Sequence, residues 1–256
     1  VAPSAVETFG KIPHALAKDE IDQIADKFSR AALRVKTAGF DMVELHGGTG
    51  YLLAQFLSPH TNKRNDEFGG ALENRQKFPL LVLSRVKSAT GDFPVGYRFL
   101  ADEWLPDGLK PQESVNFAEA LENAGIAYIS VMGGTYESFF RPEVVVKSKN
   151  EAYMADLSAA VKDKVNVPVI TAGRIKDGRV AEQVIADGKA DLVGLARVLW
   201  ADPQWPQKVK EGRGNELNHC DEKCEDVCMQ LVMKGNPAYC ARWSPQKVRA
   251  HKDLFQ

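Results

Sequence analysis

The stretch that decides the fold runs from Gly39 to Phe78 and reads GFDMVELHGGTGYLLAQFLSPHTNKRNDEFGGALENRQKF. Its early part, Asp41 to His46, is a short run with apolar Met42, Val43 and Leu45 that predicts a strand. A glycine-rich segment follows directly, from Gly47 to Tyr51. In parallel α/β folds ligands bind at the carboxyl ends of the strands, where glycines let the backbone approach them. The stretch therefore predicts a parallel strand that ends at a binding site.

Amphipathic segments lie on both sides of this strand. Residues 19–38 repeat apolar side chains at spacings of three and four, which is typical of one helix face, and the pattern stops at Gly39. The same alternation predicts further strands at 94–100, 126–132, 167–172 and 190–195, and further helices at 73–89, 111–123, 152–165, 178–186 and 204–210. Five such units fit a complete doubly wound sheet or part of a (β/α)₈ barrel, and periodicity does not choose between them.

Composition excludes several classes of protein. The chain has 256 residues with a formal net charge of −1, and its acidic and basic residues are interspersed. This balance does not indicate a nucleic-acid or membrane-surface partner. The sequence shows no apolar run long enough to predict a transmembrane helix, and no secretory signal. It begins with Val1 rather than Met, which favours a piece of a longer polypeptide.

All four cysteines lie near the end of the chain, in the pattern C-x₃-C-x₃-C-x₁₁-C: Cys220, Cys224, Cys228 and Cys240. A disulfide framework would rarely crowd into so short a segment of a chain this long. A metal or cluster site in a reducing compartment fits better, so we expect a cytoplasmic protein. On one continuous helix Cys220 and Cys228 would be about 12 Å apart along the axis, so we expect a loop there. An iron–sulfur cluster, zinc and no metal remain open, although the C-x₂-C of zinc knuckles is absent.

Two later strand ends carry glycine and arginine. Gly173-Arg174 ends the strand at 167–172, and Gly194, Ala196 and Arg197 end the one at 190–195. Each arginine alone would more often pair with a nearby carboxylate. Together with their glycines, the two ends favour a phosphate site on the last two strands, where barrels commonly bind phosphate. His46 or Tyr51 taken singly would more often be structural.

The stretch from Gly39 to Phe78 resembles the signature of the Old Yellow Enzyme superfamily. Later pieces match that family in the same order: VGYRF, ISVMGG, VPVITAGRI and ADLVGLARVLWADP. The subgroup that the chain most resembles contains 2,4-dienoyl-CoA reductase, enoate reductase and trimethylamine dehydrogenase. The resemblance implies an α/β fold of (β/α)₈ TIM-barrel type, in which the strand ending at His46 is the fourth. The chain would then represent about strands 4–8, with the first three in a longer native chain or a partner.

The resemblance also implies a site for FMN across the carboxyl face of the barrel. Arg98 would lie beside the isoalloxazine ring and stabilise negative charge on reduced flavin. His46 would hydrogen-bond an activating carbonyl of the substrate, and Tyr51 would protonate the neighbouring carbon. The family's phosphate-binding positions correspond here to Gly173, Arg174, Ala196 and Arg197.

Two positions depart from the family pattern. Thr49 stands where a second histidine or asparagine would complete the substrate-binding pair with His46, and threonine is a shorter donor. Tyr136 follows the strand at 126–132, where the dienoyl-CoA reductases place a proton-donating histidine. Tyr136 is therefore either a third catalytic residue or a side chain that packs over the site.

The cysteine segment resembles the subgroup's C-x₂-C-x₃-C-x₁₁-C motif, which binds a [4Fe–4S] cluster directly after the barrel. We expect a partial FMN-binding barrel at residues 1–212 and an iron–sulfur segment at 213–256, with one more residue than usual between Cys220 and Cys224. The resemblance thus implies a cluster bound by Cys220, Cys224, Cys228 and Cys240.

These features predict an FMN-dependent oxidoreductase that reduces an activated C=C bond of an enoate, enoyl-CoA or aryl-CoA. Electrons would come from NAD(P)H through the cluster, with FAD and NAD(P)H bound in a further region or partner. Oxidation of a methylated amine is the alternative, with Trp104 and Tyr136 as conceivable walls of an aromatic cage. A non-catalytic electron-transfer subunit is the alternative of another class. A small-molecule substrate and either a homo-oligomer or a longer chain are expected.

Overall fold

The computed structural model of the chain describes residues 1–220, 224 and 227–255. It contains two compact units. Unit 1 comprises Val1–Arg174 and Val184–Val193, and unit 2 comprises Ile175–Gln183 and Gly194–Gln256. The division that the sequence predicts at residue 212 stays a prediction, and each unit is described by itself.

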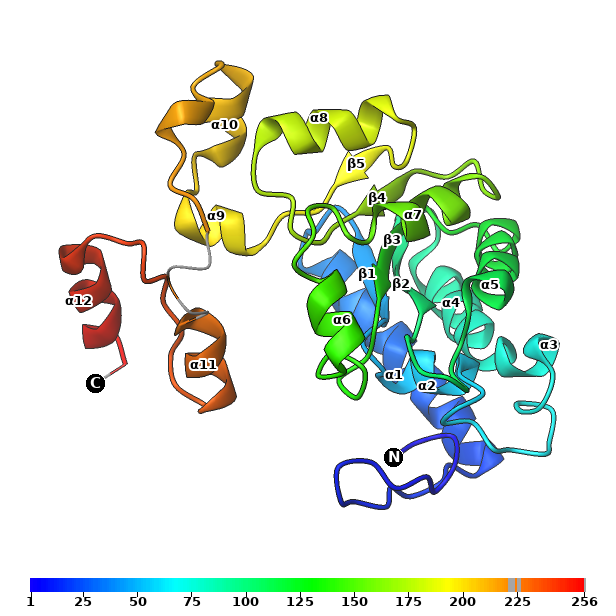
Figure 1. Ribbon diagram of the computed structural model, residues 1–256. Coiled ribbons are helices and arrows are strands. Elements are labelled where there is room, and N and C mark those ends of the chain that lie inside the picture. The colour runs from blue at the N-terminus through cyan, green and yellow to red at the C-terminus, as the bar shows by residue number, and fades with distance from the viewer. Residues whose placement is uncertain (221–223, 225–226, 256) are drawn as a thin grey trace. The chain divides into compact units, whose positions relative to one another are not determined.

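Unit 1 contains a parallel sheet whose spatial order, β1-β2-β3-β4-β5, is the order of the chain (Figure 1). Its strands are β1 (Val43–Gly47), β2 (Val95–Asp102), β3 (Tyr128–Gly133), β4 (Val169–Thr171) and β5 (Leu192–Val193). A doubly wound sheet reverses its strand order at a switch point, whereas a barrel adds each strand beside the one before. The observed order is that of a barrel.

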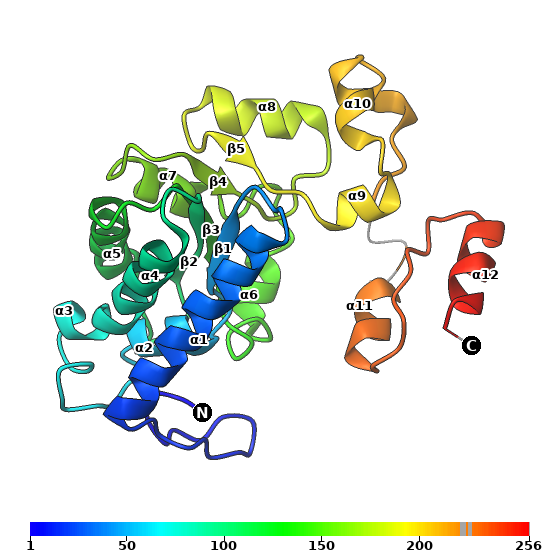
Figure 2. The ribbon, with the colours of Figure 1, turned by 180° about the vertical axis from the view of Figure 1, so that it is seen from behind.

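Helices α1 (Lys18–Thr37), α4 (Lys77–Thr90), α5 (Pro111–Asn123) and α7 (Ala155–Lys162) pack on one face of the sheet (Figure 2). Right-handed crossovers between strands added in a single direction place every helix on the same side. Three shorter helices lie in the loops: α2 (Leu52–Leu57), α3 (Leu72–Arg75) and α6 (Pro142–Lys147). The opposite face of β1, β2 and β3 carries the side chains of the candidate site.

The core of unit 1 joins these helices to the strands. Phe117 of α5 is fully buried, and its ring stacks on Phe99 of β2 with centroids 5.9 Å apart. Tyr97, two residues before Phe99, meets the same ring edge-on at 5.6 Å. Side chains two positions apart on a strand share a face, so Tyr97 and Phe99 face the helices and Arg98 faces the other way.

Unit 2 contains short helices and the cysteine segment. Helix α8 (Gly178–Ala186) crosses the boundary between the units, and the unit continues through α9 (Arg197–Ala201), α10 (Trp205–Lys210), η1 (Gly214–Glu216), α11 (Val227–Met233) and α12 (Pro245–Asp253). Its small core contains Val198, Trp205 and Leu217. In neither unit is a described helix both long enough and apolar enough to cross a membrane.

Candidate active site and cysteine centre

Three polar side chains form a row across the strands of unit 1. In the sheet register His46 of β1 lies opposite Arg98 of β2, which lies opposite Ser130 of β3. Arg98 Nη1 donates a hydrogen bond to Ser130 Oγ at 2.7 Å. Register partners share a face, and this face lies opposite the one that α5 covers. The sheet therefore presents a guanidinium and an imidazole side by side.

His46 is neutral at physiological pH. Partial burial lowers the pKa of His46, and the positive charge of Arg98 lowers it further. The backbone N–H of Gly48 donates to His46 Nδ1 at 3.4 Å. A ring nitrogen that accepts a hydrogen bond carries no proton, so Nε2 bears it. His46 thus offers a neutral N–H donor from the end of β1.

Tyr51 lies between His46 and Tyr136. Its ring centroid is 4.9 Å from that of His46, and its hydroxyl is 2.9 Å from the hydroxyl of Tyr136. The hydrogen bond with Tyr51 raises the pKa of Tyr136, and burial adds to the rise. Both phenol side chains remain about half exposed, at 46% and 47%. The loops after β1 and β3 thus bring together two hydroxyls that the sequence separates by 85 positions.

The Thr49 hydroxyl, which was expected to be a substrate-binding donor, is engaged within the protein. The Thr49 backbone has a φ of 58°, and Thr49 forms a parallel bridge with Thr135. Its hydroxyl donates to Met132 Sδ at 3.4 Å. A threonine with positive φ is strained, so the bridge between the two loops compensates for that cost. The role of Thr49 in binding substrate stays a prediction.

The predicted phosphate-binding residues fall in both units. Gly173 and Arg174 follow β4 in unit 1, with φ values of 102° and 57°. Ala196 precedes α9 and Arg197 is its first residue, in unit 2. Two consecutive residues of positive φ turn the chain sharply after β4, and such strain in a non-glycine residue often marks a functional position. The shared phosphate site stays a prediction.

The four cysteines share one neighbourhood in unit 2. Burial raises the pKa of Cys220, the positive charge of Arg197 opposes this, and Cys224, Cys228 and Cys240 as thiolates raise it further. Cys228, in α11, and Cys240 are buried, and none of the four is in a disulfide. Cys220 lies outside any helix, as its spacing predicts. Among the described residues, no group of three or more His, Cys, Asp or Glu side chains is placed to hold a single metal ion.

Asn218 and Asp202 tie the start of the cysteine segment to α9. Asp202 Oδ2 accepts from the backbone N–H of Asn218 at 2.9 Å and from Lys208 Nζ at 2.7 Å. Burial opposes ionisation, but the hydrogen bonds from Lys208 and Asn218 outweigh it and lower the pKa of Asp202. Asn218 Nδ2 donates to the carbonyls of Ala201 and Arg242. Asn218 is two residues before Cys220, and Arg242 is two residues after Cys240. These hydrogen bonds therefore hold the backbone close to both cysteines.

Sequence reasoning missed several residues of the site. Ser130 orients Arg98, yet it stands inside an apolar strand, and only the sheet register reveals it. Met132 fills the space beneath Gly48, where a side-chain carbon would lie 2.5 Å from the Met132 sulfur. Trp104 was named as a conceivable cage wall, but its φ of 54° and its neighbour Lys147, whose Nζ lies 5.2 Å from the centroid of the Trp104 ring, were not foreseen.

Comparisons with known proteins agree with this geometry. A family model described as NADH:flavin oxidoreductase / NADH oxidase matches residues 2–216. An NADH oxidase of Thermoanaerobacter brockii is 45% identical over 224 residues, which are 86% of this chain and 34% of that protein. The chain spans about a third of the length of the curated relatives that it matches first, at 34% and 36%.

Two solved structures resemble nearly the whole chain. A 2-naphthoyl-CoA reductase in complex with 2-naphthoyl-CoA has a TM-score of 0.87 at 29% identity, covering 95% of this chain and 37% of that one. Histamine dehydrogenase from Rhizobium sp. 4-9 has a TM-score of 0.83 at 32% identity, covering 94% and 35%. With the strand order of unit 1, these likenesses confirm the predicted fold class, part of a (β/α)₈ barrel followed by a cysteine-rich segment.

Proposed function

The chain belongs to the NADH:flavin oxidoreductase / NADH oxidase family, and from this membership we propose that it reduces an activated C=C bond of a carboxylate or thioester substrate. FMN, when bound, supplies the hydride for that reduction. The residues that would hold it are Arg98 at the ring and Gly173, Arg174, Ala196 and Arg197 at the phosphate. A fixed cation on the face opposite the helices and a sharply turned, arginine-bearing loop are the chemistry that an anionic flavin requires.

His46 carries the polarising role. Its neutral Nε2–H donates to the substrate carbonyl oxygen and draws electron density from the conjugated C=C bond. The β-carbon then accepts hydride more readily. A neutral donor suits this task because it gives up no proton to bulk solvent as the pH varies around neutrality.

Tyr51 carries the proton. As hydride reaches the β-carbon, the α-carbon takes the Tyr51 hydroxyl proton, and the Tyr136 hydroxyl, 2.9 Å away, replaces it. One hydride and one proton thus saturate the double bond, and Tyr136 recovers its proton from water. The Tyr51–Tyr136 hydrogen bond beside the His46 ring is the observation that carries the proposal.

Cys220, Cys224, Cys228 and Cys240 would hold a [4Fe–4S] cluster, whose chemistry is one-electron transfer between a nicotinamide-derived donor and the flavin. Four thiols that influence one another, two of them buried, provide the soft ligands that iron–sulfur clusters take. The backbone N–H of Arg242 donates to Cys240 Sγ at 3.4 Å, which suits a thiolate ligand.

Amine oxidation is less well supported. An aromatic cage for a methylated amine needs a ring face open to the substrate cation. The Trp104 ring already has a cation near it, since Lys147 Nζ lies 5.2 Å from its centroid. We therefore favour C=C reduction, the reaction class that the name of the 2-naphthoyl-CoA reductase indicates for that protein.

Replacing Tyr51 by phenylalanine tests the proposed function. We expect the kcat for reduction of an α,β-unsaturated acid or thioester to fall by about 100-fold or more while KM stays similar, because general acid catalysis contributes about 10²–10⁴-fold. Tyr128→Phe is the matched control, since Tyr128 begins β3 at the opposite end of the strands. Parental turnover by Tyr51→Phe would show that Tyr51 is a packing residue.

A further inference from the structure

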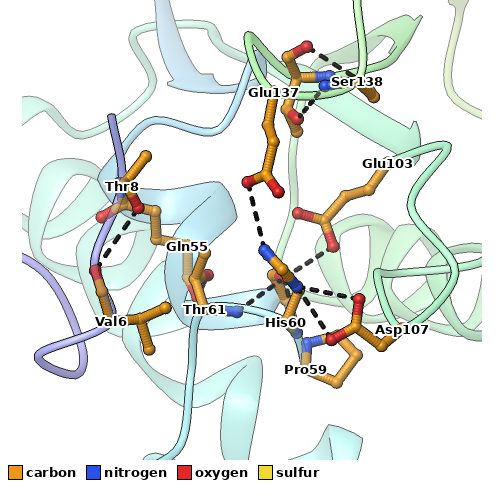
Figure 3. Close-up of polar contacts among 12 residues, drawn as sticks. Val6, Thr8, Gln55, Pro59, His60, Thr61, Glu103, Asp107, Glu137 and Ser138 are labelled. Atoms are coloured by element: carbon orange, nitrogen blue, oxygen red, sulfur yellow. Dashed lines mark hydrogen bonds and ion pairs between the residues drawn. The ribbon is translucent and has the colours of Figure 1, made fainter. Parts of the chain in front are cut away.

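His60 joins three loops of unit 1 that are distant in sequence. Its Nδ1 lies 2.9 Å from both carboxylate oxygens of Asp107, in the loop after β2. Its Nε2 lies 3.2 Å from Glu137 Oε2, in the loop after β3. Figure 3 shows the imidazole between the two carboxylates. Both ring nitrogens face acceptors, which is the arrangement of an imidazolium with two donors.

Hydrogen bonds to buried side chains hold the His60 backbone. Ser58 Oγ accepts from the backbone N–H of His60 at 3.0 Å and donates to Glu103 Oε2 at 2.6 Å. The same Glu103 oxygen accepts from the backbone N–H of Leu109, which closes the loop that carries Asp107. Glu103 and Ser58 are buried, so this support is shielded from water. The segments that carry His60 and Asp107 are thus held in place by the same buried hydrogen bonds.

Glu137 stands in the turn that carries Tyr136. The turn is closed by the Thr135 N–H donating to Ser138 Oγ at 2.8 Å and by the Phe139 N–H donating to the Thr135 carbonyl at 2.9 Å. Within it, Tyr136 meets Tyr51 and the next residue, Glu137, meets His60. These neighbouring side chains anchor one turn to two different partners.

We propose that His60, as an imidazolium bridging Asp107 and Glu137, is a positioning residue that holds the turn at Thr135–Ser138 so that the Tyr136 hydroxyl meets that of Tyr51. This proposal rests on the proposed function for its catalytic consequence. His60 touches neither substrate nor flavin in this scheme and acts only through the turn.

The charges around His60 define the pH range of the effect. Burial lowers the pKa of His60, but the hydrogen bond that His60 donates to Asp107 and the charge of Glu137 outweigh it, and the pKa is raised above its ordinary value. The hydrogen bond with His60 lowers the pKa of Asp107, with a smaller contribution from the charge of Lys63. Burial raises the pKa of nearby Glu103, and the charge of His60 opposes that rise. A raised histidine pKa means that the bridge is complete below the ordinary histidine pKa of about 6.5 and is lost as the pH rises through the raised pKa.

The test compares His60→Gln with His14→Gln in the flavin-loaded protein. His14, before α1, makes an exposed contact of the same kind with Glu20 in the first turn of that helix, at 2.8 Å, and serves as the matched control. The first measurement is hydrogen–deuterium exchange of residues 134–141, expressed as protection factors from pH 6 to 9. The second is the pH profile of kcat and KM.

We expect the parent and His14→Gln to lose protection at residues 134–141, and kcat with it, as the pH rises through the raised pKa of His60. His60→Gln should be poorly protected at every pH and show about tenfold to a hundredfold lower kcat, with KM little changed, because small misplacements of a reacting group have such costs. Glu137→Gln should behave in the same way, which guards against a folding defect peculiar to one variant.

Parental protection and an unchanged pH profile in His60→Gln would overturn the proposal. The exchange measurement needs no turnover, so it separates the two hypotheses. If neither the parent nor any variant reduces a C=C bond, but the protection of residues 134–141 depends on His60, the proposed function fails and the positioning role stands. If the protein reduces a C=C bond but the protection of residues 134–141 does not depend on His60, the proposed function stands and the positioning role fails.

Discussion

Arg98 has two electrostatic effects at the site. Its guanidinium is oriented by Ser130 and faces the side of the sheet away from the helices. The same charge lowers the pKa of His46, next to it in the sheet register, and keeps that ring neutral. One cation would thus stabilise an anionic flavin at the proposed site, and it disfavours a second positive charge on its neighbour.

Replacing Arg98 by glutamine should therefore lower the flavin midpoint potential. Losing a charged hydrogen bond costs about 1.5–3 kcal/mol, which corresponds to a shift of about 30–60 mV for a two-electron couple. The sign is negative because the reduced, anionic form loses its stabilising partner. Potentiometric titration of the purified variant measures this. Arg85→Gln is the control, because Arg85 pairs with Asp22 and Asp26 on the helical surface; an equal shift there would refute a local effect.

At the scale of elements, the stacking of α5 on β2 supports the row of site residues. Phe117 is fully buried against Phe99 and Tyr97, which alternate with Arg98 along the strand. We expect Phe117→Ala to lower the free energy of unfolding by about 3–5 kcal/mol, the usual cost of emptying so large a buried site. Urea denaturation followed by circular dichroism measures it. Phe40→Ala, at a side chain that is 65% exposed, should change stability little; equal losses would contradict this role for the core.

Elements with strong local signals were predicted closely from the sequence. Helix α5 begins at Pro111, as expected from proline's preference for a first turn, and α8 covers its predicted range of 178–186. The expected helix at 73–89 divides into α3 and α4. Helices α2 and α6 were not predicted, because each is only six residues long and gives too little periodicity. Strand β5 is shorter than its predicted range of 190–195, with only Leu192–Val193 paired to β4.

The residues of the candidate site likewise divide into those that the sequence indicates and those that only the structure reveals. His46, Tyr51 and Arg98 were predictable because each stands at a fixed place in its own strand or loop. Contacts between loops were not, since they depend on how the sheet brings distant segments together. His60 and Glu137 are 77 positions apart, and although His60 lies within the signature stretch, nothing in the sequence pairs it with Glu137. The threonine at position 49 was noted as a departure, but its bond to Met132 follows only from three-dimensional packing.

At the scale of the whole molecule, the proposed reaction needs more than the two units provide. The chain spans about a third of the relatives that it matches first, at 34% and 36% of their length. The three strands that would precede β1 in a complete barrel, and the FAD and NAD(P)H sites, remain predictions about a longer chain or a partner. Unit 1 has the proposed chemistry of proton and substrate, and unit 2 has the four thiols.

The [4Fe–4S] cluster is the prediction that tests this division of roles. Protein purified without oxygen should contain about four iron atoms per chain and absorb in the thiolate-to-iron charge-transfer region. Replacing Cys220, Cys224, Cys228 or Cys240 by alanine should each reduce the iron content, because every thiolate neutralises one corner of the cluster. His219→Ala, next to Cys220 in the chain, should keep full iron and serves as the control. About one zinc and no iron would reject the cluster and the electron path together. Full iron in Cys220→Ala alone would leave the cluster in place and assign that corner to another residue, with His219 the first to examine.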